Sequence, residues 1–342
     1  MTHTKACGVE AYDKHYGIGY QVGRGELSPY PRVNRLRKVY LDTEFYIDAQ
    51  RALLVTEAYQ KYENEPQVIK CARALENVLL NVKINIEDDE LLVGQAGGPY
   101  KMATIFPEFS YKWIIDEMDN APFDQREHDE YYMDEKTAQD LRSIAAFWDG
   151  KTVSEEIERN LSWEDKKGSN MGRGLYLLNL YHLGGVGHFC ADYATLLAIG
   201  YNGILARVEE KLAQVDSSTE EGKKKHDFYT AQQIVLKASI AYVERYAVLA
   251  DERAAVETNP VRRRELEQIA ANCHQVAGGP ARTTWEALQL WYIATEIILA
   301  ESNGHSVSYG RMDQWLYPYY KADRERGVSK ETIQKLLEVA YL

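Results

Sequence analysis

The feature that most constrains this chain is a succession of long helical patterns between residues 226 and 300. Apolar side chains recur with a helical period along residues 226–255 and again along 260–272. The stretch TTWEALQLWYIATEIILA, which follows, has the same character. Its apolar stripe is formed by Leu288, Trp291, Thr295 and Ile298. These segments predict a largely helical fold.

Earlier segments add shorter elements. A helix is predicted through ALLVTEAYQKY, residues 52–62, and another begins at Pro66. The apolar face of that second helix is predicted to contain Val68, Cys71, Ala72, Leu75, Val78 and Leu79. Residues 84–94, INIEDDELLVG, change to alternation around an acidic turn, which predicts a short hairpin.

Three further stretches carry local signals. Residues 1–40 are rich in Gly, Pro and Arg without a clear period, and predict an extended surface arm. Residues 94–101, GQAGGPYK, lack the spacing of a phosphate-binding loop and indicate a turn with a close backbone approach. Thr152 with Glu155 three residues later predicts a capping box at a helix start.

Composition limits the class of protein. With 342 residues, 45% of them hydrophobic, the chain can build a large core, with two packed subdomains expected. No apolar run approaches the roughly 18 residues of a membrane span, so a cytoplasmic protein that contacts no membrane is expected. A net charge of −12 argues against nucleic-acid binding. The four cysteines are widely separated, which predicts neither a metal site nor a disulfide framework.

His188 is the most distinctive of the eight histidines. It lies in GGVGHFCADY, where glycines allow close backbone contact and apolar residues flank it, so it is predicted to be buried or to line a cavity. A structural role and a functional role are both open on these grounds. The neighbouring Cys190 has only His188 nearby as a base, which is weak support for a reactive thiolate. The other histidines are expected to be solvated or structural.

His305 and Ser306 follow the last long apolar helix after a break at Gly304. They do not match a hydrolase nucleophile elbow, which requires glycine two residues after the serine. One interpretation makes this segment an ordinary helix terminus and turn. The other makes it a polar loop whose imidazole and hydroxyl bind a small hydroxylated ligand, with Arg311 and Asp313 paired to hold the loop and the following YPYY run packed behind it.

Seven stretches together resemble the glycyl radical enzymes, and most closely the B12-independent glycerol and propanediol dehydratases. They occur in the family's order and span nearly the whole chain. These stretches are RALLVTEAYQKYENEPQVIKCARALENVL, IEDDELLVG, FPEFSYKWIIDEMD, FWDGKTVSE, GGVGHFCADYATLLAIGYNGI, TTWEALQLWY and ESNGHSVSYGRMDQWLYPYY.

The resemblance implies roles for three residues. His188 corresponds to the histidine that protonates the departing hydroxyl group, and His305 and Ser306 to the pair that holds the substrate hydroxyls. A positioned acid helps a poor leaving group to depart as water. Because hydrogen bonds to hydroxyls reject substrates that lack them, such a pair also gives specificity.

The chain departs from the family in one respect. The family's thiyl cysteine lies in a G-C-x-E loop and its glycyl radical in an R-V-x-G-[YF] motif, and neither motif occurs in these 342 residues. The chain, residues 1–342, is therefore expected to be the N-terminal portion of a pyruvate formate-lyase-like domain. The expected fold is a mostly helical part of the family's ten-stranded α/β barrel, incomplete in this chain, which would be inactive alone.

The resemblance leaves alternatives open. A carbon–sulfur lyase acting on a small sulfonate, or a choline-type carbon–nitrogen lyase, would belong to the same family. A non-catalytic fragment or a subunit that completes a separate chain is the third reading. By resemblance, the full-length form would be homo-oligomeric, would work anaerobically on a small molecule, and would bind no cofactor. Its glycyl radical would be installed by a radical-SAM activating enzyme.

Overall fold

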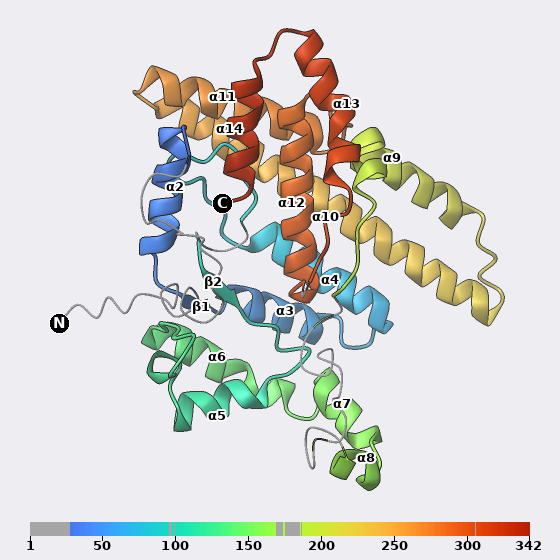
Figure 1. The fold of residues 1–342 in the computed structure, drawn as a ribbon. Helices are drawn as coiled ribbons and strands as arrows, with labels where there is room; N and C mark the ends of the chain where they lie inside the picture. The colour runs from blue at the N-terminus through green and yellow to red at the C-terminus, as the bar shows by residue number, and fades with distance from the viewer. Residues whose placement is uncertain are drawn as a thin grey trace.

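A computed structural model describes residues 28–95, 98, 100–168, 174, 185, 187–304 and 306–342 (Figure 1). The described residues are mostly helical. The main helices, in chain order, are α2 (Pro31–Asp42), α3 (Gln50–Lys61), α4 (Gln67–Asn81), α5 (Lys112–Asn120), α6 (Glu135–Trp148), α7 (Val153–Asn160), α8 (Trp163–Gly168), α9 (Tyr193–Ala213), α10 (Glu220–Val256), α11 (Pro260–Val276), α12 (Thr284–Ser302), α13 (Met312–Glu325) and α14 (Lys330–Ala340). Among the described residues, no helix is both long and apolar enough to cross a membrane.

The strongest helical patterns are confirmed. Helices α3, α4, α10, α11 and α12 lie where the apolar period predicted them. On the predicted stripe of α12, Leu288, Trp291 and Thr295 are buried and Ile298 is partly buried. The capping box is also present, because the Thr152 side chain accepts from the Glu155 backbone while the Glu155 carboxylate accepts from the Thr152 backbone.

On α4 the predicted apolar face is only partly right. Ala72, Leu75, Val78 and Leu79 are buried, whereas Val68 and Cys71 are exposed. Ile69 is buried in their place. In the first turn of α4, the buried face is therefore centred on Ile69 rather than on Val68.

The extended arm predicted for residues 1–40 is wrong over its last ten residues, which lie in α2. Pro31 occupies the first turn of that helix, where its missing N–H costs nothing. Its buried residues are Val33 and Leu36. Residues 1–27 lie outside the described part of the chain.

The hairpin predicted for residues 84–94 is also wrong. The acidic turn is present, at Asp88 and Asp89, but no strands pair across it among the described residues. Side chains of other segments donate hydrogen bonds to the backbone carbonyls of these residues instead. Arg262 donates to the Glu87 and Glu90 carbonyls at 3.0 and 2.7 Å, and Trp285 Nε1 donates to the Leu91 carbonyl at 2.8 Å. A segment whose polar groups are bonded by arginine and tryptophan does not need a partner strand.

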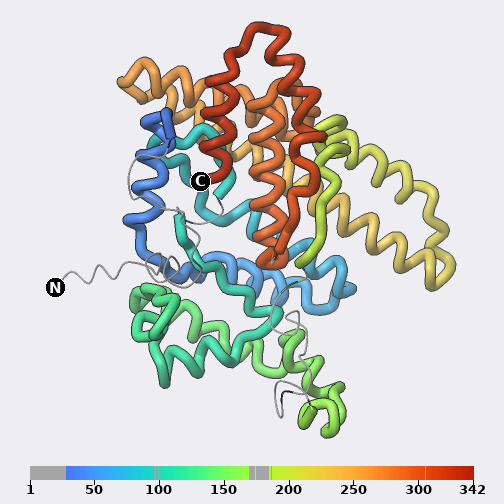
Figure 2. The backbone as a smooth tube through the Cα atoms, viewed as in Figure 1, coloured from blue at the N-terminus to red at the C-terminus, as the bar shows by residue number. Residues whose placement is uncertain are grey.

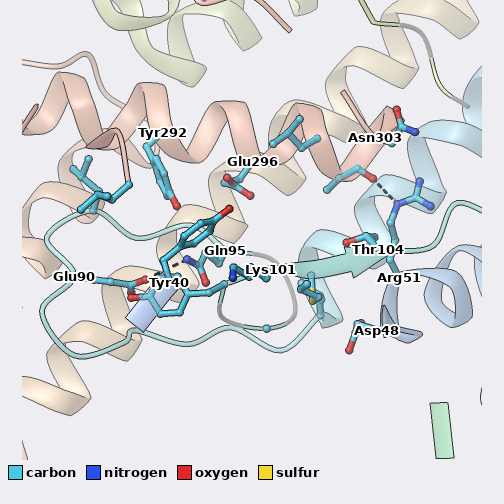
Figure 3. Close-up of a pocket in the computed structure, with 18 of the residues that line it drawn as sticks. Tyr40, Asp48, Arg51, Glu90, Gln95, Lys101, Thr104, Tyr292, Glu296 and Asn303 are labelled. Carbon is cyan, nitrogen blue, oxygen red and sulfur yellow. Dashed lines mark hydrogen bonds between the residues drawn. The ribbon is translucent and has the colours of Figure 1, made fainter. Parts of the chain in front are cut away.

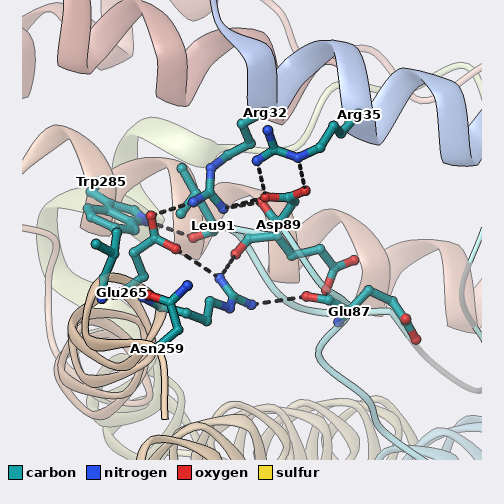
Figure 4. A network of polar contacts seen from close by, with 11 residues as sticks. Arg32, Arg35, Glu87, Asp89, Leu91, Asn259, Glu265 and Trp285 are labelled. Atoms are coloured by element: carbon teal, nitrogen blue, oxygen red, sulfur yellow. Dashed lines mark hydrogen bonds and ion pairs between the residues drawn. The ribbon is translucent and has the colours of Figure 1, made fainter. Parts of the chain in front are cut away.

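Figure 4 shows how the same segment is joined to α2 and α11. Arg35 donates two bonds of 2.6 Å to the Asp89 carboxylate. Arg32 donates to the Asp89 carbonyl at 2.6 Å and also pairs with Glu265 on α11. We refer to Arg32, Arg35, Asp89, Arg262 and Glu265 as the α2 anchor.

Two tyrosines of α10 connect the helical core to the segment that precedes β2. Tyr242 and Tyr246 have fully buried rings, and their hydroxyls donate to the carbonyls of Gly94 and Gln95. Buried tyrosine with a bonded hydroxyl combines apolar packing with a fixed polar contact. The core helices thereby fix the position of residues 94 and 95.

The sheet consists of two parallel strands, β1 (Tyr46–Asp48) and β2 (Met102–Thr104). Ile47 lies opposite Ala103, and the other edge of β1 bonds to Tyr132, whose carbonyl accepts from the Ile47 N–H at 2.9 Å. A parallel pair this small is normally part of a larger, covered sheet. The fold is thus mostly helical with an incomplete sheet.

Candidate functional site

The first segment of the candidate site is the turn that follows α12. The helix ends at Ser302, and Asn303, Gly304 and Ser306 all have positive φ, at 54°, 63° and 58°. Glycine is favoured at position 304 because its φ is positive, and a Cβ atom there would lie 2.0 Å from Leu299 Cδ2, so that this side chain would have to move. The Val307 N–H closes the turn on the Gly304 carbonyl at 3.1 Å.

The structure places the predicted residues of this turn unequally. Ser306 is exposed, in a left-handed conformation. His305 lies outside the described residues. The predicted pair between Arg311 and Asp313 is present, with bonds of 3.0 and 2.8 Å, although both side chains are exposed. The predicted packing of YPYY is only partial, since Tyr317 is exposed.

The second segment is the part of the glycine-rich stretch that precedes α9. Gly185 and Gly187 are buried, and a Cβ atom on Gly185 would lie 2.0 Å from the Ser302 carbonyl oxygen. Only glycine permits this approach of two backbones. The segment therefore rests directly on the end of α12.

The two segments also pair by backbone hydrogen bonding. The Ser308 N–H donates to the Phe189 carbonyl at 2.9 Å, and Cys190 and Ser308 form an isolated parallel bridge. In Figure 2 the chain leading into α9 runs beside the end of α12 and the start of α13. Residues 118 positions apart in sequence are therefore neighbours, and the segments that carry His188 and Ser306 lie side by side.

The first part of the prediction for His188, that it is buried, is wrong for this chain. The side chain is exposed, and its φ is 57°. The glycine contacts bury the backbone around it rather than the imidazole. Cys190, also exposed, has its sulfur near Gly310, where a Cβ atom would lie 2.7 Å away.

A cavity of about 460 Å³ is lined in part by Leu299, Ala300 and Asn303 at the end of α12 (Figure 3). Asn303, the first residue of the turn, lines one end of it, and Glu90 lines the other. The Glu296 carboxyl group faces the cavity from α12, and burial raises its pKa to about 7. Burial likewise raises the pKa of Glu90 to about 7, against hydrogen bonding that favours its charged form.

Sequence reasoning missed two residues of this region. Glu296 is a single carboxylate within the apolar run WYIATEIILA, and Arg51, the second residue of α3, is only 5% exposed. A lone charge inside an apolar run is a signal that could have identified Glu296, whereas the polar sequence of α3 gives no such signal for Arg51.

His274 has a structural role, as predicted. Its two ring nitrogens bond Glu244 and Asp251 of α10 at 3.0 and 2.9 Å, and these contacts raise its pKa. Within the described part of the chain, no group of His, Cys, Asp and Glu side chains is arranged to hold a metal ion.

Comparison with known proteins identifies the family. The model of the family described as "Pyruvate formate lyase-like" matches residues 26–342. The chain belongs to this family. A (2S)-3-sulfopropanediol dehydratase of Klebsiella oxytoca is 47% identical over the whole chain, which covers 42% of that protein. An isethionate sulfite-lyase of Desulfovibrio desulfuricans is 31% identical over 92% of the chain and is covered to 38%.

A solved structure shows the same fold. The glycerol-bound B12-independent glycerol dehydratase of Clostridium butyricum superposes with a TM-score of 0.86 and 34% identity, over 93% of this chain and 40% of that one. The chain thus spans about 40% of the length of the relatives it matches. The expected fold, a mostly helical part of the glycyl radical enzyme barrel, is confirmed.

Proposed function

We propose that this chain is the N-terminal part of a glycyl radical lyase that dehydrates a small 1,2-diol, and that the diol carries a sulfonate. The relative named as a (2S)-3-sulfopropanediol dehydratase supports this choice through 47% identity over the entire chain. The observation that carries the proposal is the pairing of the two segments, since Phe189 and Ser308 bond each other beside His188 and Ser306.

The proposed roles follow from the chemistry of dehydration. The hydroxyl group of one carbon leaves as water, and the neighbouring carbon, which keeps its oxygen, becomes the aldehyde carbonyl. His188 donates the proton that turns the departing hydroxide into water. Ser306 and His305 hold the hydroxyls through hydrogen bonds. The hydrogen-abstracting radical would be supplied by elements outside these 342 residues, because the sequence has neither motif that carries them.

The proposed role of His188 has to account for the exposure of its side chain in this chain. A proton donor works best with a pKa near the working pH and with solvent excluded. We infer that the remainder of the complete protein covers this imidazole and closes the pocket. We also infer that the complete protein is cytoplasmic and homo-oligomeric and is activated anaerobically by a radical-SAM enzyme.

The decisive experiment uses the complete protein, activated anaerobically, with His188→Ala and, as a matched control, His226→Ala on the exposed surface of α10. We expect aldehyde from (2S)-3-sulfopropanediol, a loss of at least 100-fold in kcat for His188→Ala, and normal activity for His226→Ala. Equal activity of the two variants would contradict the role of His188.

A second candidate function is carbon–sulfur cleavage, favoured by the isethionate sulfite-lyase relative at 31% identity. The same assay separates the two reactions, because cleavage of a sulfonate releases sulfite whereas dehydration retains the sulfur in the product. Sulfite release from isethionate without aldehyde from a diol would replace the first proposal with the second.

A further inference from the structure

The FPEF stretch at residues 106–109 surrounds the buried cation Arg51. A buried guanidinium needs partners for its donors, since an unpaired charge in the interior is very costly. Arg51 Nη1 donates to Glu108 Oε2 at 3.1 Å, and Nη2 bonds the other carboxylate oxygen. The Phe106 ring lies 3.8 Å from Arg51 Cζ. Glu108 and Phe106 therefore fix both the plane and the direction of the guanidinium.

Arg51 Nη1 also donates to the Ile105 carbonyl at 3.3 Å, and two further donor bonds of Arg51 reach the end of α12. Nε donates to the Ala300 carbonyl at 2.6 Å and Nη2 to the Glu301 carbonyl at 3.1 Å, and Figure 3 shows the side chain at this terminus. The last carbonyls of a helix have no partner within the helix. A cation there also interacts favourably with the helix dipole. Arg51 thus holds the final turn of α12 from a different helix.

The final turn of α12 leads directly into the loop that holds Asn303, Gly304 and Ser306, which is the candidate substrate-binding loop. Only Ser302 separates Glu301 from Asn303, where the chain turns left-handed toward Ser306. The Ser302 carbonyl is also the atom on which Gly185 rests. A shift of the α12 terminus would therefore move Ser306 and disturb the contact with the segment of His188 at the same time.

We propose that Arg51 is a positioning residue for the loop that holds Asn303, Gly304 and Ser306, and so a determinant of substrate affinity in the complete enzyme. Only the effect on substrate affinity rests on the proposed function, whereas the positioning of the loop does not. Lysine cannot replace Arg51, because one ammonium group cannot make a two-pronged contact with Glu108 and reach two carbonyls as well.

The chain provides a matched control in Arg245. This arginine is partly buried and donates to the carbonyls of Leu79 and Val82 at the end of α4, so it holds a different helix end from the one that Arg51 holds. Comparing Arg51→Lys with Arg245→Lys therefore separates a local effect on the loop from the general cost of replacing an arginine that caps a helix.

The first measurement is amide hydrogen exchange on the 342-residue chain. For Arg51→Lys we expect at least tenfold faster exchange at Asn303, Val307 and Ser308, whose N–H groups are bonded in the present structure. For Arg245→Lys we expect the increase at the end of α4 instead. Unchanged exchange at these three amides, or an equal rise along the whole chain, would overturn the proposal.

The second measurement is the kinetics of the complete, activated enzyme. We expect Arg51→Lys to raise the KM for the diol about tenfold with a smaller change in kcat, whereas Arg245→Lys leaves KM unchanged. A lower kcat at constant KM would indicate fewer folded molecules and would contradict the positioning role. If the unmodified enzyme turns over no diol, the proposed function fails, while hydrogen exchange still decides whether Arg51 positions the loop.

Discussion

At the scale of single residues, the chain contains a carboxyl group in an unusual setting. Glu296 lies on α12 within an apolar sequence and faces the cavity, and burial is the sole cause of its raised pKa. In the described part of the chain, no hydrogen bond or ion pair reaches this carboxyl group. The folded state consequently favours the protonated acid.

The free energy of unfolding should therefore fall as the pH rises towards the pKa of Glu296 in the folded state. Below pH 4.5 the group is protonated in both states, and between pH 4.5 and about 7 only the unfolded state releases its proton. Above about pH 7 the full cost applies, up to about 3 kcal/mol. We expect Glu296→Gln to stabilise the chain at pH 8 by up to this amount and to change little at pH 4.5.

Urea unfolding at the two pH values tests this expectation. Glu325→Gln, at an exposed position of α13, serves as the control and should leave the pH dependence unchanged. An equal shift of the Glu296→Gln midpoint at both pH values would show that the carboxyl group is not held protonated in the folded chain.

At the scale of elements, we expect α2 to depend on charge more than on apolar packing. Its buried residues are Val33 and Leu36, and the α2 anchor joins it to residues 87–91 and to α11. The Arg35 guanidinium holds the pKa of Asp89 below its usual value. Asp89 has a φ of 66°, a conformation that asparagine also tolerates.

Asp89→Asn should thus remove the negative charge without changing the backbone conformation at this position. We expect the amides of α2 to exchange several times faster in this variant, with the core helices unaffected. The control is Asp42→Asn, whose partner Lys38 lies within the same helix and is exposed. Similar exchange in both variants would show that α2 is held by its apolar contacts.

At the scale of the whole molecule, the sheet is the weak point. In the part of the chain that the structure describes, no third strand pairs with the outer edge of β2. Large apolar side chains near this sheet are exposed, among them Leu41, Phe45 and Tyr132. Open strand edges and apolar patches favour association.

We therefore expect the isolated 342-residue chain to self-associate. Size-exclusion chromatography with light scattering should give a mass above 39.2 kDa that rises with concentration. A monodisperse monomer across the micromolar range would contradict this expectation. The same sample should show no turnover of a diol, because the thiyl and glycyl motifs are missing from it.

The sequence alone determined the elements whose signals are local. The periods of α10, α11 and α12 and the pairing of Thr152 with Glu155 depend on neighbours a few residues away, so they could be predicted. It also determined the family, through motifs in a fixed order. It failed at residues 84–94, where side chains from distant helices satisfy the backbone in place of a partner strand.

Only the tertiary structure decided which distant residues meet. Nothing in the local sequence of Gly185 or Ser302 indicates that their backbones touch, and nothing near Arg51 indicates that it holds the end of a helix about 250 residues away. The sequence named His188 and Ser306, whereas the fold brought their segments together. The physical reason is that close packing and buried charge select contacts across the whole chain, while periodicity reports only the contacts within one helix or strand.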